Sequence, residues 1–355
     1  MSKIQNVRKG DELNVDLLLP YISKELGIHV GKVSIQQFSG GYSNLTYLLT
    51  LENDTKYVLR RPPVGANIKS GHDMSREYHI LTALGPSQIK VPTTILMCAD
   101  TSIIGSEFYL MEYVEGCILR SDIVENDIPS PTEMSSIFQA FVDQFVTLHN
   151  TDYKKFGLES LTKEGNYIER QISGWSRRYY TAKTDEVTSV ENLIKWLDAH
   201  MPSPSGQCLL HNDFKYDNFI LDKKTSDIKA ILDWEMSTIG DPLMDVGSSL
   251  GYWINQDDPE WIQSIKLSPT TILGNPSREE LLHQYATLSG RDPGNGVFYF
   301  AYGMLKLAVI AQQIYARYKA GHSSNPKFAG LGMVVDACGT MGLQSIAHKR
   351  LDRLF

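Results

Sequence analysis

The sequence predicts an α+β protein with two lobes, a β-rich N-terminal lobe at residues 1–115 and a larger α-rich lobe at residues 116–355. Two observations support this division. Short runs in which apolar and polar residues alternate dominate the first part, and apolar residues at helical spacing dominate the second. The length of 355 residues suits two such lobes. Gly116 follows the last strand predicted in the first part and is the expected hinge.

The first part is predicted to contain an antiparallel meander followed by a helix. Asn53 and Asp54 form a turn signal between two of its strands, and a Ser-Gly-Gly-Tyr-Ser run separates the first two strands. In the helix, Glu77 shares a face with apolar residues and therefore needs a partner of opposite charge. The predicted strands lie at 33–38, 45–51, 57–60 and 108–114, and the helix lies at 74–84.

Helices with one apolar face dominate the second part. Ser130 and Ser277 each stand three residues before a glutamate, which is the capping-box pattern that begins a helix. A compact β-like region at 208–233 separates the helices and contains the densest group of polar residues. The predicted helices lie near 130–148, 167–180, 190–200, 277–289 and 297–320.

The composition argues against several classes of protein. The net charge of −7 comes without any run of Lys or Arg, so no nucleic-acid partner is expected. The four cysteines are far apart, which argues against a zinc site or a disulfide framework. The N-terminal residues are polar, unlike a signal peptide, and no run of about 18 apolar residues predicts a membrane span. We therefore expect a cytoplasmic protein with no membrane partner.

Three polar residues in the β-like region form the set that phosphoryl transfer requires. Asp213 lies in a polar loop, and Asp233 ends an apolar strand. A predicted hairpin between them would bring Asn218 close to Asp233. One carboxylate can orient the attacking hydroxyl group, while an amide oxygen and a second carboxylate hold Mg²⁺ on the phosphates. The set therefore predicts a phosphotransferase.

The spacing of these residues resembles that of a known family. The pattern His211-x-Asp213-x-x-x-x-Asn218, followed by Asp233, resembles the aminoglycoside phosphotransferase-like branch of the protein-kinase-like superfamily. The run from Leu232 to Asp245 is similar to the kinase-like domains fused to some eukaryotic acyl-CoA dehydrogenases, and to their free-standing bacterial relatives. The resemblance spans about residues 33–317 and implies a protein-kinase-like two-lobe fold.

The resemblance also implies an activity and its catalytic groups. The chain is expected to use ATP and Mg²⁺ to phosphorylate a hydroxyl group of a small molecule. Asp213 would orient that hydroxyl group and accept its proton late in the transfer, while Asn218 and Asp233 would hold the metal. His211 is expected to support the loop. Lys215 either neutralises charge on the γ-phosphate or lies on the surface.

The N-terminal lobe is expected to bind the nucleotide. Arg60 stands where most kinases have a lysine, and its planar cationic group can still contact the α- and β-phosphates while Glu77 pairs with it. Strand alternation places Val58 on the same face as Arg60, where it would cover the adenine. The remaining residues implied to bind the nucleotide are Gly40, Gly41 and Ser43 in a phosphate-covering loop, and Glu112 and Val114 in a hinge whose backbone would bind the adenine.

Several residues have structural as well as functional interpretations. Asp241 and Asp245 are expected to brace the catalytic loop or cap a helix. Gln312 and Arg317 are weaker candidates for the acceptor site. A set of aromatic residues is expected to belong mainly to the core, with an aromatic wall for the acceptor as the alternative: Trp175, Tyr179, Tyr180, Tyr252 and Trp253.

Alternative functions remain open at this point. Arg60 motivates a nucleotide-binding pseudokinase without turnover, although Asp213, Asn218 and Asp233 are all present. An aminoglycoside kinase would need an acidic acceptor pocket, for which Asp257, Asp258 and Glu260 are candidates unless they form a solvated loop. The chain has no D-F-G or A-P-E motif of protein kinases, and no P-loop or Rossmann fingerprint. A hydroxyacyl-CoA or another hydroxylated metabolite is the acceptor that the resemblance favours, and the sequence does not indicate an oligomeric state.

Overall fold

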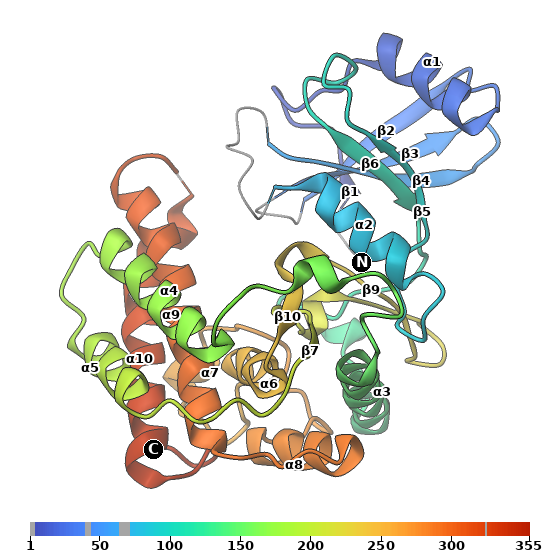
Figure 1. Ribbon diagram of the computed structural model, residues 1–355. Coiled ribbons are helices and arrows are strands. Elements are labelled where there is room, and N and C mark those ends of the chain that lie inside the picture. The colour runs from blue at the N-terminus through green and yellow to red at the C-terminus, as the bar shows by residue number, and fades with distance from the viewer. Residues whose placement is uncertain (1–3, 40–43, 64–71, 324) are drawn as a thin grey trace. The chain divides into compact units, whose positions relative to one another are not determined.

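The computed structural model describes residues 4–39, 44–63, 72–323 and 325–355 (Figure 1). The chain divides into two compact units. The first comprises Met1–Ile118, Phe156–Leu158 and Asn218–Met236, and the second comprises Leu119–Lys155, Glu159–Asp217 and Ser237–Phe355. The hairpin between Asn218 and Met236 therefore belongs to the same unit as the N-terminal sheet, although the preceding loop that contains Asp213 belongs to the second unit.

The first unit contains a six-stranded antiparallel sheet in the order β1-β2-β3-β4-β6-β5. Its centre is the predicted meander, since β2 pairs with β3 and β3 pairs with β4. The strands are β1 (Ile4–Gln5), β2 (Val33–Phe38), β3 (Leu45–Leu51), β4 (Lys56–Arg61), β5 (Thr94–Cys98) and β6 (Phe108–Glu112). The last of these ends two residues earlier than the sequence predicted.

Two helices pack on this sheet. Leu18 and Ile22 of α1 (Val15–Leu26) join Leu49 and Leu59 in one apolar core, which buries the apolar side of an element that the sequence analysis did not predict. Helix α2 (Met74–Leu84) begins and ends where the sequence predicted, and it packs against β5 and β6. The side chain of Asp73 caps α2 by accepting a hydrogen bond from the backbone N–H of Arg76 at 2.8 Å.

The predicted hairpin forms from β8 (Phe219–Leu221) and β9 (Ile228–Ile231). Backbone hydrogen bonds attach it to the first unit. Cys117 and Leu221 exchange N–H···O bonds of 2.9 and 2.7 Å, and the N–H of Ile231 donates to the carbonyl oxygen of Lys90 at 2.7 Å. The short helix η4 (Trp234–Met236) follows β9 and contacts α2. The hairpin is thereby tied to the sheet that precedes it by more than a hundred residues in sequence.

The second unit is mainly helical. Both predicted capping boxes form, at Ser130 and at Ser277. Strands β7 (Cys208–Leu210) and β10 (Thr238–Gly240) form a small antiparallel pair. The helices are α3 (Pro131–Asn150), α4 (Tyr167–Ala182), α5 (Thr188–Ala199), α6 (Pro242–Gly251), α7 (Glu260–Gln263), α8 (Arg278–Ser289), α9 (Gly296–Lys319) and α10 (Leu331–His348), with 3₁₀ turns η1 (Glu125–Asp127), η2 (Glu159–Leu161), η3 (Tyr216–Asn218, which ends on the first residue of the hairpin segment) and η5 (Pro326–Gly330).

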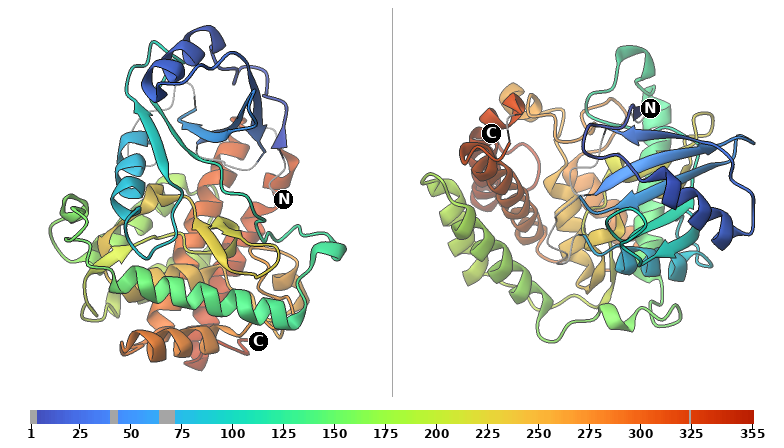
Figure 2. Two further views of the ribbon diagram at one scale, coloured as in Figure 1. Left: turned by 90° about the vertical axis from the view of Figure 1, so that its right-hand side faces the viewer. Right: turned by 90° about the horizontal axis from the view of Figure 1, so that it is seen from above.

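Helix α9 is the central packing element of the second unit, in contact with α4, α6 and α10 (Figure 2). Its backbone approaches α6 closely because glycines meet at the crossing: a Cβ atom on Gly303 would lie 1.9 Å from the carbonyl oxygen of Gly247. By length and composition α9 could cross a membrane, but 78% of its most apolar window is buried inside the protein, as in the core helix of a globular protein.

Candidate functional site

Arg60 projects from β4 toward α2. Strand alternation gives Arg60 and Arg61 opposite faces of the sheet. Arg61 donates hydrogen bonds to the hydroxyl group of Tyr47 and to the carbonyl oxygen of Asp11, at 3.0 and 2.8 Å, on the face that α1 covers. Val58, which is also buried, shares the other face with Arg60, as the sequence predicted.

The guanidinium group of Arg60 is held by three carboxylates. Its Nη1 atom lies 3.1 Å from Glu77 Oε1, and its Nη2 atom lies 3.1 Å from Asp233 Oδ1 and 3.9 Å from Glu235 Oε2. Burial alone would lower the pKa of Arg60, but these carboxylates, Glu77 foremost, raise it well above its ordinary value. The charge pair predicted for Glu77 therefore forms, although the sequence analysis did not anticipate the direct contact between Arg60 and Asp233.

Asn218 and Asp233 are brought together by the hairpin. The N–H of Leu232 donates to the carbonyl oxygen of Asn218 at 2.8 Å, so the residue before Asp233 is bonded to Asn218. The Asp233 side chain is 35% exposed and its backbone has a φ of 68°. Carboxylate and amide oxygens are donors that suit Mg²⁺, which binds through one or two carboxylates and the substrate phosphates rather than through an all-protein cage. The residues present thus fit such an ion.

A cage of protein ligands is absent from the part of the chain that the structure describes. Among those residues no group of three or more His, Cys, Asp or Glu side chains converges as a metal site.

Glu235 belongs to this network and was missed by the sequence analysis. Its Oε2 atom accepts a hydrogen bond of 2.8 Å from Asn44, whose own side-chain oxygen lies 3.0 Å from Nδ1 of His72. Asn44 directly follows the predicted phosphate-covering residues Gly40, Gly41 and Ser43, which lie outside the described residues. The position of Glu235, two residues after Asp233, is the signal that could have identified it.

The predicted adenine-binding hinge lies at the end of β6. The carboxylate of Glu112 accepts a hydrogen bond from the N–H of Thr93 at 2.8 Å, and the Glu112 N–H donates to the Thr93 carbonyl oxygen at 2.9 Å. The side chain of Glu112 is therefore used within the sheet. Val114 lies two residues beyond the strand and is half-buried.

Asp213 belongs to the second unit, whereas the other described site residues belong to the first. The loop that contains Asp213 is held by Asp245, a fully buried residue of α6. The carboxylate of Asp245 accepts hydrogen bonds from the backbone N–H groups of His211 and Asn212, at 2.7 and 2.8 Å. Asn212 has a φ of 64°, so the loop turns sharply just before Asp213. Asp245 thus braces the loop, as the sequence predicted.

The carboxylate of Asp213 is kept ionised by its neighbours. Burial would raise the pKa of Asp213, but Lys215, Lys306 and His211 together lower it to about 2. Lys215 Nζ lies 3.0 Å from Asp213 Oδ2 and 4.4 Å from the centre of the Tyr252 ring. Lys215 is therefore not a free surface lysine.

Lys306 was also missed by the sequence analysis. It lies on α9, is 2% exposed, and donates hydrogen bonds to the carbonyl oxygen of Asn212 and to the hydroxyl group of Ser248, the latter at 3.2 Å. Burial lowers the pKa of Lys306 to about 8, against the raising effect of Asp213 and Asp245. A single lysine in the otherwise apolar first four turns of this helix is the sequence signal for its role.

Other candidates have structural roles. Asp241 caps α6 by accepting a hydrogen bond from Leu243 N at 2.9 Å, as expected. Asp258, a candidate for an acidic acceptor pocket or a solvated loop, is instead buried against Arg278, with N–O distances of 2.6 and 2.9 Å. Gln312 is buried and donates to the carbonyl oxygen of Ala182 at 2.9 Å.

The aromatic residues are mostly core, as predicted. Trp175, Tyr179 and Trp253 are buried. Tyr252 is half-buried beside Lys215, and Tyr180 is 50% exposed, so the core assignment is wrong for Tyr180.

Relatives among curated proteins share most of this chain. It is 36% identical over 322 residues to acyl-CoA dehydrogenase family member 10 of Mus musculus, covering 90% of this chain and 30% of that protein. It is 35% identical over 318 residues to acyl-CoA dehydrogenase family member 11 of Homo sapiens, covering 88% of this chain and 40% of that protein. The chain thus spans well under half of the length of these two relatives.

Solved structures share the fold. A putative aminoglycoside phosphotransferase from Ralstonia eutropha is 28% identical, with a TM-score of 0.80, over 95% of this chain and 99% of that chain. A thermostable mutant of aminoglycoside phosphotransferase APH(4)-Ia, in ternary complex with AMP-PNP and hygromycin B, is 14% identical, with a TM-score of 0.59. The match covers 91% of this chain and 97% of that chain. These likenesses confirm the predicted α+β, protein-kinase-like two-lobe fold.

A protein-family model also matches most of this chain. The model of the phosphotransferase enzyme family matches residues 34–279, which include every predicted site residue from Gly40 to Asp233. This match covers more than half of the chain and includes the Asp213 loop, the hairpin and the Arg60 strand. The chain belongs to the phosphotransferase enzyme family.

Proposed function

We propose that this protein transfers the γ-phosphoryl group of ATP, with Mg²⁺, to a hydroxyl group of a small molecule. The observation that carries the proposal is the state of Asp213, an ionised carboxylate on a loop that Asp245 braces through two backbone hydrogen bonds. A carboxylate in this position can orient a hydroxyl group and take its proton. The family of phosphotransferases to which the chain belongs supports the same reaction class.

The first unit supplies the groups proposed to bind nucleotide and metal. Arg60, steadied by Glu77, would contact the α- and β-phosphates. Its contact with Asp233 would be exchanged when Mg²⁺ binds, since the cation attracts the same carboxylate. Asn218 would supply an amide oxygen to that ion. When bound, Mg²⁺ neutralises charge on the phosphates and holds their geometry.

The remaining nucleotide contacts follow from the family resemblance. Val58 would cover the adenine, and the backbone at Glu112 and Val114 would bind its edge. Gly40, Gly41 and Ser43 would cover the phosphates. Nucleotides occur in solved relatives of the same fold, for example AMP-PNP in the complex with hygromycin B.

The acceptor that we propose is a hydroxyacyl-CoA or another hydroxylated metabolite. The curated relatives are acyl-CoA dehydrogenase family members, of which this chain matches 30% to 40% of the length. An aminoglycoside, which is polycationic, would need acidic groups. Asp258 is not free to serve as one because Arg278 already pairs with it.

The proposal is tested by measuring ATP turnover with Mg²⁺ against hydroxyacyl-CoAs, amino sugars, choline and aminoglycosides. Turnover with one acceptor should be abolished by Asp213→Ala, while the affinity for Mg-ATP stays within about twofold, because Asp213 is assigned to the acceptor and not to the nucleotide. Loss of ATP binding in that variant would contradict the assigned role.

The same samples distinguish a pseudokinase. Three results together would indicate a pseudokinase: Mg-ATP raises the Tm, no acceptor in the panel stimulates turnover, and ATP hydrolysis is equally slow in wild type and Asp213→Ala. The protein would then bind nucleotide without catalysis. If Mg-ATP does not raise the Tm, the proposed assignment of the nucleotide site is wrong.

A further inference from the structure

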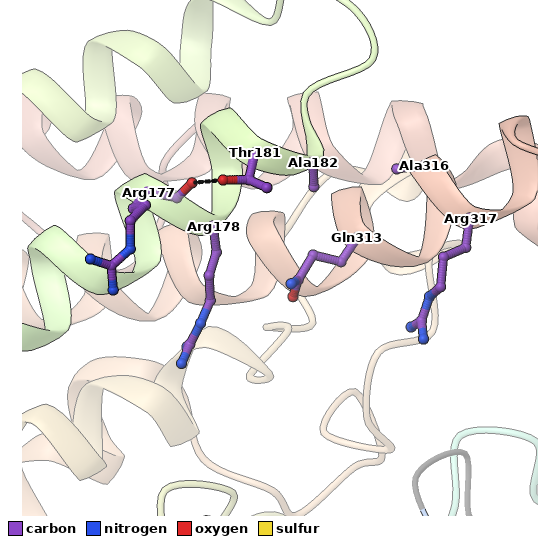
Figure 3. Close-up of a pocket in the computed structure, with 7 residues that line it drawn as sticks. All are labelled: Arg177, Arg178, Thr181, Ala182, Gln313, Ala316 and Arg317. Atoms are coloured by element: carbon purple, nitrogen blue, oxygen red, sulfur yellow. Dashed lines mark hydrogen bonds between the residues drawn. The ribbon is translucent and has the colours of Figure 1, made fainter. Parts of the chain in front are cut away.

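A basic pocket opens between α4 and α9 in the second unit, and Arg317, a candidate for the acceptor site, is one of the residues that line it. It has a volume of about 450 Å³, within the roughly 300–1,000 Å³ that ligand pockets occupy. Figure 3 shows that Arg178, Gln313 and Arg317 extend from the two helices toward the same side. The pocket, called here the α4–α9 pocket, is lined by Arg177, Arg178, Thr181, Ala182, Gln313, Ala316 and Arg317.

The three arginines of this pocket have no acidic partner among the residues that the structure describes. Neighbouring lysines do have one. Lys183, at the end of α4, lies 2.5 Å from Glu191, and Lys319, two residues after Arg317, lies 2.9 Å from Asp185. Glu191 and Asp185 are therefore already paired with lysines, and the pocket concentrates positive charge that an anion would neutralise.

One residue of the pocket, Arg178, lies near the lysine that supports the loop of Asp213. The Arg178 guanidinium lies 4.5 Å from the Trp175 ring centre, and Lys306 Nζ lies 5.8 Å from the same centre. Lys306 in turn bonds the carbonyl oxygen of Asn212, next to Asp213. The charge of Arg178 also contributes to the lowered pKa of Lys306, as expected for two cations within Coulombic reach. Trp175 thus lies close both to a cation of the pocket and to the lysine that supports the Asp213 loop.

We propose that the α4–α9 pocket binds a phosphate group that the acceptor itself carries, and so selects phosphate-bearing hydroxyl compounds as substrates. This inference rests on the proposed function for the role of Asp213 but not for the binding site. Guanidinium groups match phosphate oxygens with paired, charge-assisted hydrogen bonds. Three of them, with the amide of Gln313, offer enough donors for a diphosphate. The hydroxyl group of Thr181 already donates to the carbonyl oxygen of Arg177 at 2.9 Å.

The same charges argue against a cationic acceptor. A polycationic aminoglycoside would be repelled at this pocket by three unpaired guanidinium groups, whereas an anion would be attracted. Holding the acceptor by a phosphate group remote from the reacting hydroxyl would use binding energy to position that hydroxyl at Asp213.

The test is a calorimetric titration of the full chain with inorganic pyrophosphate in buffer without Mg²⁺ and nucleotide. The double variant Arg178→Gln/Arg317→Gln should bind pyrophosphate at least about tenfold more weakly than wild type, because two charge-assisted contacts are lost. The matched control is Lys319→Gln, which removes one charge from the same helix but lies outside the pocket lining, and it should bind within about twofold of wild type. Equal affinity of the double variant and wild type would overturn the proposal.

Two further arms separate the possible ligands. Succinate should bind at least about tenfold more weakly than pyrophosphate, and equal or tighter binding of succinate would replace phosphate by carboxylate as the ligand class. For an acceptor that is turned over, the double variant should raise its KM with the KM for ATP unchanged, while a raised KM for ATP alone would overturn the assignment to the acceptor.

The failure of this proposal is distinguishable from failure of the proposed function. Pyrophosphate binding is measured without turnover, and Asp213→Ala should leave it unchanged while abolishing any phosphoryl transfer. Arginine-dependent pyrophosphate binding in a protein without turnover would support the pocket and reject the kinase. Turnover without arginine-dependent pyrophosphate binding would support the kinase and reject the pocket.

Discussion

The ammonium group of Lys306 donates a hydrogen bond to the backbone carbonyl oxygen of Asn212, the residue directly before Asp213. This bond joins α9 to the Asp213 loop, while Asp245 of α6 accepts hydrogen bonds from the backbone N–H groups of the same loop. The close crossing of α6 and α9 at Gly247 and Gly303 brings both supports to the same loop. The position of Asp213 is therefore determined by residues distant in sequence.

The buried charge of Lys306 should make stability depend on pH. Its folded-state pKa of about 8 lies below the ordinary value of 10.5. Between these two pH values the unfolded chain keeps the proton and the folded protein does not, so this group adds stability as pH rises through the window. The free energy of unfolding of wild type, relative to Lys306→Met, should rise by about 3 kcal/mol between pH 7.5 and 10.5.

Urea denaturation of both proteins across that range measures the effect. Taking the difference from Lys306→Met cancels the other lysines and tyrosines that titrate at the same pH. The variant leaves the Asn212 carbonyl oxygen without this donor, which costs about 1–3 kcal/mol at every pH and does not alter the slope. A pH-independent difference would show that Lys306 titrates normally.

Asp245→Asn should weaken the catalytic loop. An amide group keeps the shape but has one acceptor oxygen, so it cannot accept both N–H bonds and also lie against His149, whose Nε2 is 3.3 Å away. We expect a loss of about 2–4 kcal/mol in the free energy of unfolding and a fall in kcat, since Asp213 loses its brace.

A matched control lies one turn earlier on the same helix. Asp241→Asn keeps the N-cap acceptor for Leu243 but replaces the oxygen that accepts the N–H of Ser205, so it should also cost about 1–3 kcal/mol, with kcat little changed because Ser205 lies outside the Asp213 loop. Denaturant melts and turnover of the two variants check this. Equal losses of kcat from both substitutions would show that the loop does not depend on Asp245 in particular.

Arg60→Lys and Arg61→Lys should separate nucleotide binding from packing. A lysine at position 60 cannot pair with Glu77 and contact the α- and β-phosphates with separate nitrogens, so the affinity for Mg-ATP should fall by about tenfold. Arg61 serves Tyr47 and Asp11 on the opposite face, so Arg61→Lys should cost about 2 kcal/mol of stability with affinity for Mg-ATP within twofold. Calorimetry and thermal melts test both, and the same affinity change in both variants would refute the distinction.

Local signals predicted the elements whose bounds depend on local chemistry. The apolar face of α2 allowed this helix to be located, and the alternating strands of the meander and the hairpin were recognised from their own local patterns. The pairing of Glu77 with Arg60 was predictable because a carboxylate on an apolar helix face needs a cation.

The missed elements depend on tertiary packing. Helix α1 contains Pro20, and α10 contains glycines that lower helix propensity. In α10 those glycines permit close packing, since a Cβ atom on Gly339 would lie 2.4 Å from the hydroxyl oxygen of Ser189. Lys306 and Glu235 were missed because their partners are distant in sequence, and spacing alone does not report such contacts.

Asp258 should prove structural and not part of an acceptor site. Its carboxylate forms two short contacts with the buried guanidinium group of Arg278, so Asp258→Ala would leave that cation with only the more distant Asp352, at 3.8 Å, and lower the free energy of unfolding by about 3–5 kcal/mol. Asp257→Ala is the adjacent control: Asp257 is exposed and lies 3.9 Å from the exposed Arg353, so its loss should change stability by less than about 0.5 kcal/mol. Thermal melts check the stabilities.

Arg278→Met together with Asp258→Leu should recover much of the loss, because a buried ion pair replaced by apolar groups is often neutral. An acceptor KM that rises in Asp258→Ala at a temperature where the variant remains folded would contradict the structural role and return Asp258 to the acceptor site.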